Sequence, residues 1–521
     1  MKKKLHPAFA LMMVALMSGC AGGAATETQK IPSTDKILVV DLHTWMPTGS
    51  SSSADLVSIV STQEIADAFK KETGITIKWF TGKSLSGEKN EASADFIKAI
   101  QNGTMPAIGF SWSAFTDRGY YLDLSEALDT SNEFLTPEEQ ALYPTWKDQF
   151  PSYVWNLKDC QDLNGKPIAL PLILNPGPAT GWYYNKTQFE SLGYSVPTSW
   201  FEFRNLAMEI NSNPDAGPYV YKQTLELQNW PFQFSIGPSF AQLLFDVVDM
   251  NHDGIISNRE NMEALAKGVY SPLKEENPEN YQIAQAAYVT IKDFYKNMLP
   301  YNWKTANRDS AWSEGKALLR ENGLWSLRAE KGNDNTRDWK FGVFPMPLVS
   351  SDSKEYLIGK SLPAAAAKLA KTESVQLDSS ETYTTLTRAE RFIELYQPAP
   401  SLYLNLMHHG IYSNDKVKEN AIKFLKFLST PEHVSQMCVE HQGVLGGVKG
   451  AVPGRSLDEW LMSSFPKSKA INWPTSATLA DDVTINQYFS KWVSDAISDA
   501  EFFQNVASIQ KESATNNLQG A

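Results

Sequence analysis

Residues 36–80 read KILVVDLHTWMPTGSSSSADLVSIVSTQEIADAFKKETGITIKWF, and this stretch decides the fold. The apolar segment at 37–40 predicts a short buried strand. A segment with apolar residues at helical spacing follows and ends at Gly74, and the apolar segment at 75–80 predicts a second strand. A strand, a helix and a strand at this spacing predict a parallel βαβ unit.

The same plan is repeated farther along the chain. A helix is predicted from Ala94, and a strand at 108–110 leads directly into Ser111 and Trp112. Repetition of this unit predicts an α/β protein, in which the loops at the carboxyl ends of parallel strands are the natural ligand sites. Both side chains are therefore candidates for ligand contact.

The first twenty residues, MKKKLHPAFALMMVALMSGC, have the features of an export signal. Three lysines precede an apolar run of about a dozen residues, which is too short to span a bilayer as a helix. The run ends in MSGC, which resembles the lipobox of bacterial lipoproteins, although that family usually has leucine where Met17 stands. The resemblance implies a signal peptide at 1–19, an acylated Cys20 and a flexible tether over 20–36. It implies an extracytoplasmic protein that is anchored by lipid to the cell membrane; the alternative is an ordinary secreted protein with an unmodified cysteine.

The composition predicts a large folded protein and disfavours a nucleic-acid partner. With 42% hydrophobic and 20% charged residues, a chain of 521 residues is long enough for two or more lobes. No second apolar run approaches the roughly 20 residues that a membrane helix needs. Removing residues 1–19 takes three of the 47 basic residues and none of the 59 acidic ones, which leaves a net charge of −15. Nucleic-acid binding requires a basic face.

Two cysteines, Cys160 and Cys438, remain if Cys20 is acylated. An even pair in an oxidising compartment is compatible with one disulfide. Two buried, unpaired thiols are equally compatible, because the sequence gives no distance between the two residues. Both alternatives stay open at this point.

Tryptophan is unusually frequent, with 15 residues beside 20 tyrosines and 25 phenylalanines. In an exported protein this surplus favours a sugar-binding surface, because the C–H face of a sugar ring packs on an indole ring while its hydroxyl groups bind polar neighbours. Most individual tryptophans belong to a core, and we assign Trp200 and Trp312 there from their helical contexts. The candidates for sugar contact lie at predicted strand ends or in loops, and they are Trp45, Ser111, Trp112, Trp182, Trp230, Trp303 and Trp325.

Six stretches, in order, resemble the extracellular carbohydrate-binding proteins of ATP-binding-cassette (ABC) importers. They are IADAFKKETGITIKW, FIKAIQNGTMPAIGFSW, GWYYNKTQFESLGYSVPTSWFEF, EGKALLRENGLWSL, WKFGVFPMPL and ENAIKFLKFLSTPEH. Two departures are Ala107, where the family usually has aspartate after proline, and the long insertion between Leu362 and Tyr412. The resemblance implies an α/β, two-lobed periplasmic-binding-protein-like fold of type II, with an oligosaccharide in the cleft between the lobes. It also implies a monomer that delivers the sugar to the transmembrane permease subunits of an ABC importer.

In this family the chain crosses more than once between the lobes, so each lobe is discontinuous. We place the crossings near Leu170, Gly342 and Tyr412. The first lobe is then predicted at 37–169 and 342–412, and the second lobe at 170–341 and 413–521.

Residues 249–260, DMNHDGIISNRE, fit the calcium loop of an EF-hand at each defining position. Gly254 permits the sharp turn, and helical apolar spacing on both sides predicts two flanking helices. The predicted ligands are the side chains of Asp249, Asn251, Asp253 and Ser257, the backbone carbonyl of Ile255 and the carboxylate of Glu260. Because a single loop has no paired second hand, we expect a structural Ca²⁺ rather than a calcium sensor. The alternative is an acidic surface turn without a metal, and direct coordination of an acidic sugar is less favoured because the loop already offers a full ligand set.

The charge of the sugar stays open. Solute-binding proteins with an EF-hand-like loop include those that bind alginate, related uronic-acid oligosaccharides and fructo-oligosaccharides. Arg118, Lys304, Arg308 and Arg328 lie near the candidate loops. They either clamp a carboxylate or are solvated surface charges.

The competing class is an enzyme, such as a lipid-anchored glycoside hydrolase or lyase acting on the same sugars. Hydrolysis needs two suitably spaced carboxylates, and 59 acidic residues are compatible with such a pair. The chain has no G-x-S-x-G elbow, no H-E-x-x-H zinc helix and no P-loop. We therefore predict a binding protein and not an enzyme.

Overall fold

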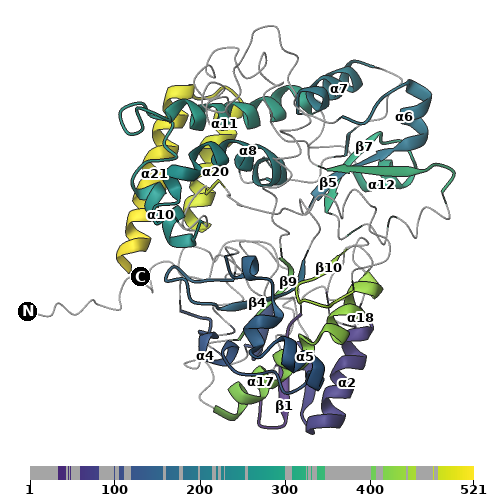
Figure 1. The fold of residues 1–521 in the computed structure, drawn as a ribbon. Coiled ribbons are helices and arrows are strands. Elements are labelled where there is room, and N and C mark those ends of the chain that lie inside the picture. Colours follow the sequence, from purple (N-terminus) through teal and green to yellow (C-terminus); the bar gives the residue numbers. More distant parts are fainter. Residues whose placement is uncertain are drawn as a thin grey trace, which may run out of the picture.

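The structure is a computed structural model. It describes residues 33–42, 45, 47, 59–80, 99, 102, 105–110, 119–156, 160–174, 180–197, 200–213, 219–220, 225–227, 229–252, 256–299, 308–323, 326, 330, 337–345, 400–406, 415–441, 444–452, 473–474 and 479–520. Two lobes, each built on its own sheet, lie one above the other in Figure 1.

The first lobe contains a six-stranded sheet in the order β10-β4-β9-β3-β1-β2. Its strands are β1 (Ile37–Val40), β2 (Thr76–Trp79), β3 (Ile108–Phe110), β4 (Ala169–Leu174), β9 (Pro400–Leu406) and β10 (Leu445–Gly446). β1 runs parallel to β2 and β3, and α2 (Ser61–Thr73) joins β1 to β2. The helix ends at Gly74, whose φ of 74° lies in the left-handed region that favours glycine. The predicted βαβ unit is confirmed.

Helices from both halves of the sequence complete the first lobe. They are α4 (Ser125–Leu128), α5 (Pro137–Leu142), α17 (Asp415–Leu428) and α18 (Pro431–His441), with 3₁₀ turns at Trp146–Gln149 and Ser152–Asn156. The ring of Phe69 in α2 contacts the rings of Phe424 and Phe427 in α17, at centroid distances of 5.0 and 5.3 Å. The amphipathic α17 therefore buries its apolar face in the core of the first lobe.

The second lobe contains a four-stranded sheet in the order β6-β7-β5-β8. Its strands are β5 (Thr180–Asn185), β6 (Tyr219–Val220), β7 (Leu319–Gly323) and β8 (Phe341–Pro345). β5 pairs antiparallel with β7 and β8, and β6 pairs parallel with β7. Its helices are α6 (Lys186–Leu192), α7 (Trp200–Ser212), α8 (Gly237–Ala241), α9 (Phe245–Val248), α10 (Asn258–Ala266), α11 (Tyr281–Asp293), α12 (Arg308–Ser313), α20 (Leu479–Val493) and α21 (Asp499–Gly520), with π-helical turns at Phe232–Ile236 and Phe294–Met298 and a 3₁₀ turn at Gln242–Leu244.

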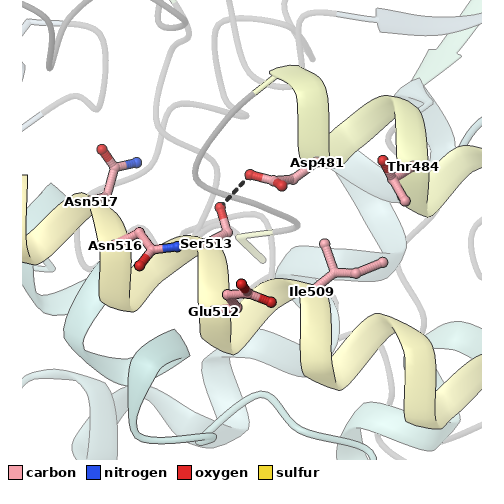
Figure 2. Close-up of a pocket in the computed structure, with 7 residues that line it drawn as sticks. All are labelled: Asp481, Thr484, Ile509, Glu512, Ser513, Asn516 and Asn517. Carbon is pink, nitrogen blue, oxygen red and sulfur yellow. Dashed lines mark hydrogen bonds between the residues drawn. The ribbon is translucent and has the colours of Figure 1, made fainter. Parts of the chain in front are cut away.

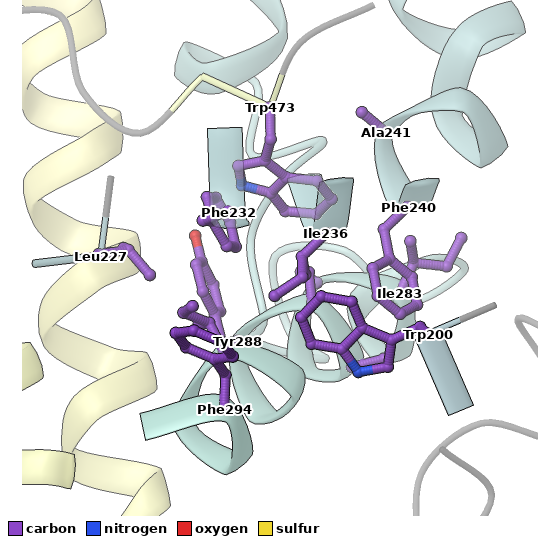
Figure 3. Close-up of a cluster of buried hydrophobic side chains, with 14 of the residues drawn as sticks. Trp200, Leu227, Phe232, Ile236, Phe240, Ala241, Ile283, Tyr288, Phe294 and Trp473 are labelled. Atoms are coloured by element: carbon purple, nitrogen blue, oxygen red, sulfur yellow. The ribbon is translucent and has the colours of Figure 1, made fainter. Parts of the chain in front are cut away.

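Aromatic side chains dominate the core of the second lobe (Figure 3). Trp473 packs edge to face against Phe232 and Tyr270, with ring centroids 6.4 and 5.0 Å away. Trp200 is fully buried in the same cluster, and Trp312 is buried in a smaller cluster beside the sheet. The assignment of these last two tryptophans to the core is confirmed.

The lobe boundaries differ from those predicted. β4 belongs entirely to the first sheet, so the first crossing follows Leu174, and β8 belongs to the second sheet, so the next crossing follows Pro345. The segment 415–452 lies in the first lobe and not in the second, because α17, α18 and β10 pack there. The chain has returned to the second lobe at Trp473.

Two further features bear on the sequence predictions. Cys160 and Cys438 are not joined by a disulfide and are buried in the core of the first lobe, so of the two alternatives the structure has the two buried thiols. Burial raises the pKa of Cys438 to about 12. Among the described residues, no helix is long and apolar enough to cross a membrane.

Candidate functional site

One end of the second sheet adjoins the segments that cross between the lobes. β4 of the first sheet ends at Leu174, and β5 of the second sheet begins six residues later at Thr180. Gly323, the last residue of β7, pairs with Thr180, and Pro345, the last residue of β8, pairs with Gly181. We call this part of the sheet, formed by Thr180, Gly181, Glu321–Gly323 and Pro345, the crossing end.

Two of the predicted sugar-binding tryptophans lie in hydrophobic cores. Trp182 is fully buried in the second lobe, with its ring 5.0 Å from that of Phe203. Trp45 is 2% exposed in the first lobe, where it stacks on His441 at a centroid distance of 4.7 Å and an interplanar angle of 18°. In this conformation neither ring has a face that a sugar can reach, so we now regard both as core residues.

The other candidates are placed only in part. Trp230 is half-buried and lies at the start of the helical stretch that leads into the turn Phe232–Ile236. Trp325 follows Gly323, the last residue of β7, by two positions in the sequence. The remaining sequence candidates, together with Trp325, lie outside the described residues, and they are Ser111, Trp112, Trp303, Arg118, Lys304, Arg328 and the side chain of Arg308.

The crossing end carries buried polar groups that the sequence analysis did not select. Thr180 Oγ1, both carboxyl oxygens of Glu321, Asn322 Nδ2 and the Oγ of the nearby Ser326 have no hydrogen-bond partner in the structure. All four side chains are at most 3% exposed. Burial raises the pKa of the Glu321 carboxyl well above its usual value. The signal was present in LLRENG, where a glutamate interrupts a strand whose burial is continuous.

Charged groups on the opposite face of β7 are paired with one another. Glu330 accepts hydrogen bonds from Arg320 Nη1 at 2.5 Å and Trp312 Nε1 at 3.1 Å, and it forms an ion pair with Arg337 Nη2 at 2.7 Å. The Arg337 guanidinium also lies over the ring of Trp339, 4.7 Å from its centroid. All three charged side chains are at most 8% exposed. We call Glu330, Arg320 and Arg337 the charge cluster.

The predicted calcium loop closes on itself through Glu260. Its carboxylate accepts hydrogen bonds from the backbone amides of Met250 and Asn251, at 3.0 and 3.3 Å, and from the amide and hydroxyl of Ser257, at 2.9 and 2.8 Å. Glu260 and Asp249 are buried, at 7% and 5% exposure. The predicted ligands Asp253 and Ile255 lie outside the described residues, and within those residues no group of three His, Cys, Asp or Glu side chains is placed to hold a metal ion.

A surface pocket of about 380 Å³ lies between α20 and α21 (Figure 2). The hydroxyl of Ser513 donates to Asp481 Oδ2 at 2.6 Å across this pocket. Its lining contains no aromatic ring on which a sugar can stack. The lining residues are Asp481, Thr484, Ile509, Glu512, Ser513, Asn516 and Asn517.

Comparison with known proteins identifies the family. Residues 53–434 match the family of bacterial extracellular solute-binding proteins. The chain belongs to this family. The family consists of binding proteins, so the protein is a solute-binding protein and not an enzyme, and an extracytoplasmic location follows from the same match.

Relatives and solved structures agree with this family. The multiple sugar-binding protein of Streptococcus mutans is 26% identical over 250 residues, and the match covers 46% of this chain and 49% of that protein. The chain thus spans about half the length of the curated relative it matches. The structure of RafE in complex with raffinose matches with a TM-score of 0.52 at 15% identity. This match covers 92% of this chain and 99% of the RafE chain. A chitin oligosaccharide binding protein matches with a TM-score of 0.55 at 16% identity, and this match covers 93% of this chain and 99% of that protein's chain. These likenesses establish the two-lobed fold.

Proposed function

We propose that this protein captures an oligosaccharide between its two lobes and delivers it to the permease of an ABC importer. The observation that carries the proposal is the family match over 53–434 together with a relative and two structural neighbours that are named for sugars or bind them. The two sheets, joined by crossing segments, are the architecture that such capture requires.

The proposed mechanism is a population shift. A ligand that contacts both lobes stabilises the closed arrangement by its higher affinity for that arrangement. Aromatic rings, with Trp230 and Trp325 as our candidates, would pack on the sugar faces. The closed complex then docks on the transmembrane subunits, where the importer releases the sugar.

Thermal unfolding of residues 21–521 with raffinose, chitotriose, a fructo-oligosaccharide and a uronic-acid trisaccharide tests this proposal. Binding to the native state alone raises stability by about 2.7 kcal/mol at a ligand concentration of 100 Kd. We expect one sugar class to raise the melting temperature while chromatography detects no product. Absence of any shift, or breakdown of a sugar, would refute sugar capture.

We propose that Cys20 carries the lipid anchor. The support is the lipobox-like MSGC sequence behind the apolar run. Replacing Cys20 by Ser should move the protein from the membrane fraction to the soluble fraction, while a Cys438→Ser variant keeps the wild-type distribution. Equal membrane retention of the Cys20→Ser variant would contradict the anchor.

We propose that the loop 249–260 holds a structural Ca²⁺. Its donor set consists of oxygen atoms, which hard cations prefer, and two of its carboxylates, Asp249 and Glu260, are buried beside the same turn. When bound, the ion would neutralise these carboxylates and tie α9 to α10. In the structure, Glu260 already connects the two ends of the loop, because its carboxylate accepts hydrogen bonds from Ser257 and from the amides of Met250 and Asn251.

The calcium proposal is tested by Glu260→Gln with Glu263→Gln as the matched control. Glutamine keeps the capping geometry at Ser257 but not the bidentate carboxylate. Calcium should raise the melting temperature of wild type and the control and leave Glu260→Gln unaffected. If neither calcium nor a chelator changed the melting temperature of wild type, the proposed calcium site would be refuted.

A further inference from the structure

A short hairpin of the first lobe, residues 160–168, reaches into the second lobe. Its base belongs to the first lobe, because Cys160 is buried in that core and the amide of Leu124 donates to the Pro167 carbonyl at 2.8 Å. Its tip belongs to the second lobe, because Leu163 is 3% exposed and is a member of the core there. The hairpin therefore joins the two lobes without being part of a segment that crosses between them.

The tip is held against α10 by a hydrogen bond between the lobes. Asn258, the first residue of α10, donates from Nδ2 to the backbone carbonyl of Gln161 at 3.1 Å. If this contact separates, Leu163 is exposed to water, and exposure of a buried leucine is unfavourable. A movement of the lobes that keeps the contact is therefore favoured over one that breaks it.

The hairpin is stiff enough to act as a fixed support. Asp162 Oδ1 accepts hydrogen bonds from the amides of Asn164 and Lys166, at 2.8 and 2.9 Å, and the Asp162 amide donates to the Lys166 carbonyl at 3.0 Å. Gly165 has a φ of 75°, in the left-handed region that favours glycine, and its amide donates to the Asp162 carbonyl at 3.0 Å. Lys166 also pairs with Asp123 of the first lobe at 3.1 Å. The tip therefore moves together with the first lobe.

We propose that the hairpin and the crossing after Leu174 are the two fixed points of lobe closure, so that the first lobe rotates about the line of β4. The inference rests on the proposed function and concerns the movement that encloses the sugar. Two rigid bodies that are joined at two separate places rotate relative to each other about the line through those places. That line is β4. The amide of Ile168, just before β4, donates to the carbonyl of Cys160 at the base of the hairpin, at 2.8 Å, and β4 ends at Leu174. Its two ends are about 17 Å apart.

The order of the first sheet predicts which parts move most. β10 lies on one side of β4, whereas β9, β3, β1 and β2 follow in order on the other side. β2 is four strand spacings from β4, which is about 19 Å, so a rotation of about 10° around β4 moves β2 by about 3 Å. The helix α2 leads into β2 and moves with it, while the hairpin stays close to α10.

Distances between pairs of spin labels test this axis on residues 21–521, in which both native thiols are buried. The near pair joins Asn164→Cys in the hairpin to Arg259→Cys in α10. The far pair joins Lys70→Cys in α2 to Glu190→Cys in α6, and Figure 1 draws these two helices on the same side of the molecule. All four replaced residues are exposed. Electron paramagnetic resonance gives each distance without sugar and with raffinose, chitotriose or a uronic-acid trisaccharide, and calorimetry on the labelled proteins shows which sugar binds.

The sugar that binds should change the distance of the far pair by about 3 Å for each 10° of closure, roughly, and leave the distance of the near pair unchanged. A change in the near pair as large as that in the far pair would overturn the inference. A sugar that binds without moving the far pair would overturn it as well, with sugar binding intact.

Leu163→Ala tests the hairpin without any sugar. Loss of the buried side chain should broaden the distance distribution of the near pair. Leu142→Ala is the matched control, because it shortens a leucine of α5 that is 70% exposed, and it should leave the distribution unchanged. Equal distributions in the two variants would mean that the tip does not hold the lobes, and the inference would be wrong. If no probe sugar bound, sugar capture itself would fail, and this comparison would still show whether the hairpin is a fixed point.

Discussion

Replacing Glu330 by Gln should destabilise the second lobe and leave the first lobe unchanged. The Glu330 carboxylate is 2% exposed, pairs with two buried guanidiniums and accepts hydrogen bonds from one of them and from one indole. Glutamine has nearly the same shape but no charge, so the two cations of the charge cluster would lose their described carboxylate.

The expected magnitude follows from these contacts. A hydrogen bond to a charged group contributes about 1.5–3 kcal/mol, so the two guanidinium contacts amount to about 3–6 kcal/mol. The amide oxygen of glutamine keeps one ordinary hydrogen bond, worth about 1 kcal/mol, and the net loss is therefore about 2–5 kcal/mol. Removal of one partner from a buried ion pair has a similar effect, about 3–5 kcal/mol.

Hydrogen exchange under native conditions is the suitable assay, because a two-lobed protein does not unfold in a single two-state step. Peptides that cover β7 and β8 should lose protection corresponding to 2–5 kcal/mol, whereas peptides that cover β4 keep theirs. Glu190→Gln is the control, since Glu190 forms an exposed pair with Lys186 at 4.0 Å. A loss below about 1 kcal/mol in β7, or an equal loss in β4, would refute the assigned role of the charge cluster.

Three further predictions follow from buried groups. Asn132→Ala should lower the free energy of unfolding of the first lobe by about 2 kcal/mol in urea titrations, because its amide donates to Gln149 and to the Lys426 carbonyl, and the substitution leaves Gln149 Oε1 without this donor while the Lys426 carbonyl keeps the Ser429 hydroxyl; a loss below about 1 kcal/mol would count against this network. Both thiols, Cys160 and Cys438, should resist Ellman's reagent at pH 8 in a chain that starts at residue 21 and react only in urea, since both are buried and the pKa of Cys438 is raised to about 12; rapid reaction of either thiol in the native protein would contradict their burial. Because burial raises the pKa of Glu321, the stability from this group is complete below its unfolded pKa and is lost as pH rises through the folded pKa; Glu321→Gln should therefore gain stability over wild type as pH rises above about 4, the unfolded pKa of a glutamate, in denaturant titrations, and a constant difference would argue against the raised pKa.

Local patterns in the sequence were sufficient to predict the helices and strands, but not to predict which elements pack against one another. The strand, helix and strand at 36–80 were predictable because their spacing and the stop at Gly74 are local signals. The helix α17 was equally readable, yet it was assigned to the wrong lobe. The apolar face of α17 indicates that the helix packs against a core. Which core this is depends on contacts between residues far apart in the sequence. For example, Asn420 Nδ2 donates a hydrogen bond to the carbonyl of Asp35, which is 2.8 Å away and 385 residues earlier.

The candidate site was predictable in the same limited sense. Frequent tryptophan favoured a sugar-binding protein, but the strand TGWYYN is buried along nearly its whole length, so alternation could not tell which of its side chains reach the ligand. Trp182 proved to be a core residue, and the buried Glu321, with which it pairs on the neighbouring strand, was not selected. An ionisable residue inside a continuously buried strand was the better signal, because burial without a partner is unfavourable unless something completes it.

The position of β9 has a consequence for how the chain folds as it is synthesised. β9 joins β4 to β3, so without residues 400–406 the first sheet consists of two unconnected parts. The carboxylate of Glu440 then binds the amides of Val60 and Ser61 at the start of α2, both at 2.8 Å. All four strands of the second sheet, by contrast, have been made by residue 345. The first sheet is therefore not complete until residues 400–406 have been made, and its closure requires contacts some 300 to 400 residues apart, which are slow to form. The core of the second lobe waits longer still, for Trp473, α20 and α21. A chain that stops before β9 would expose the unpaired edges of β3 and β4, so neither lobe is complete before the last part of the chain has been made.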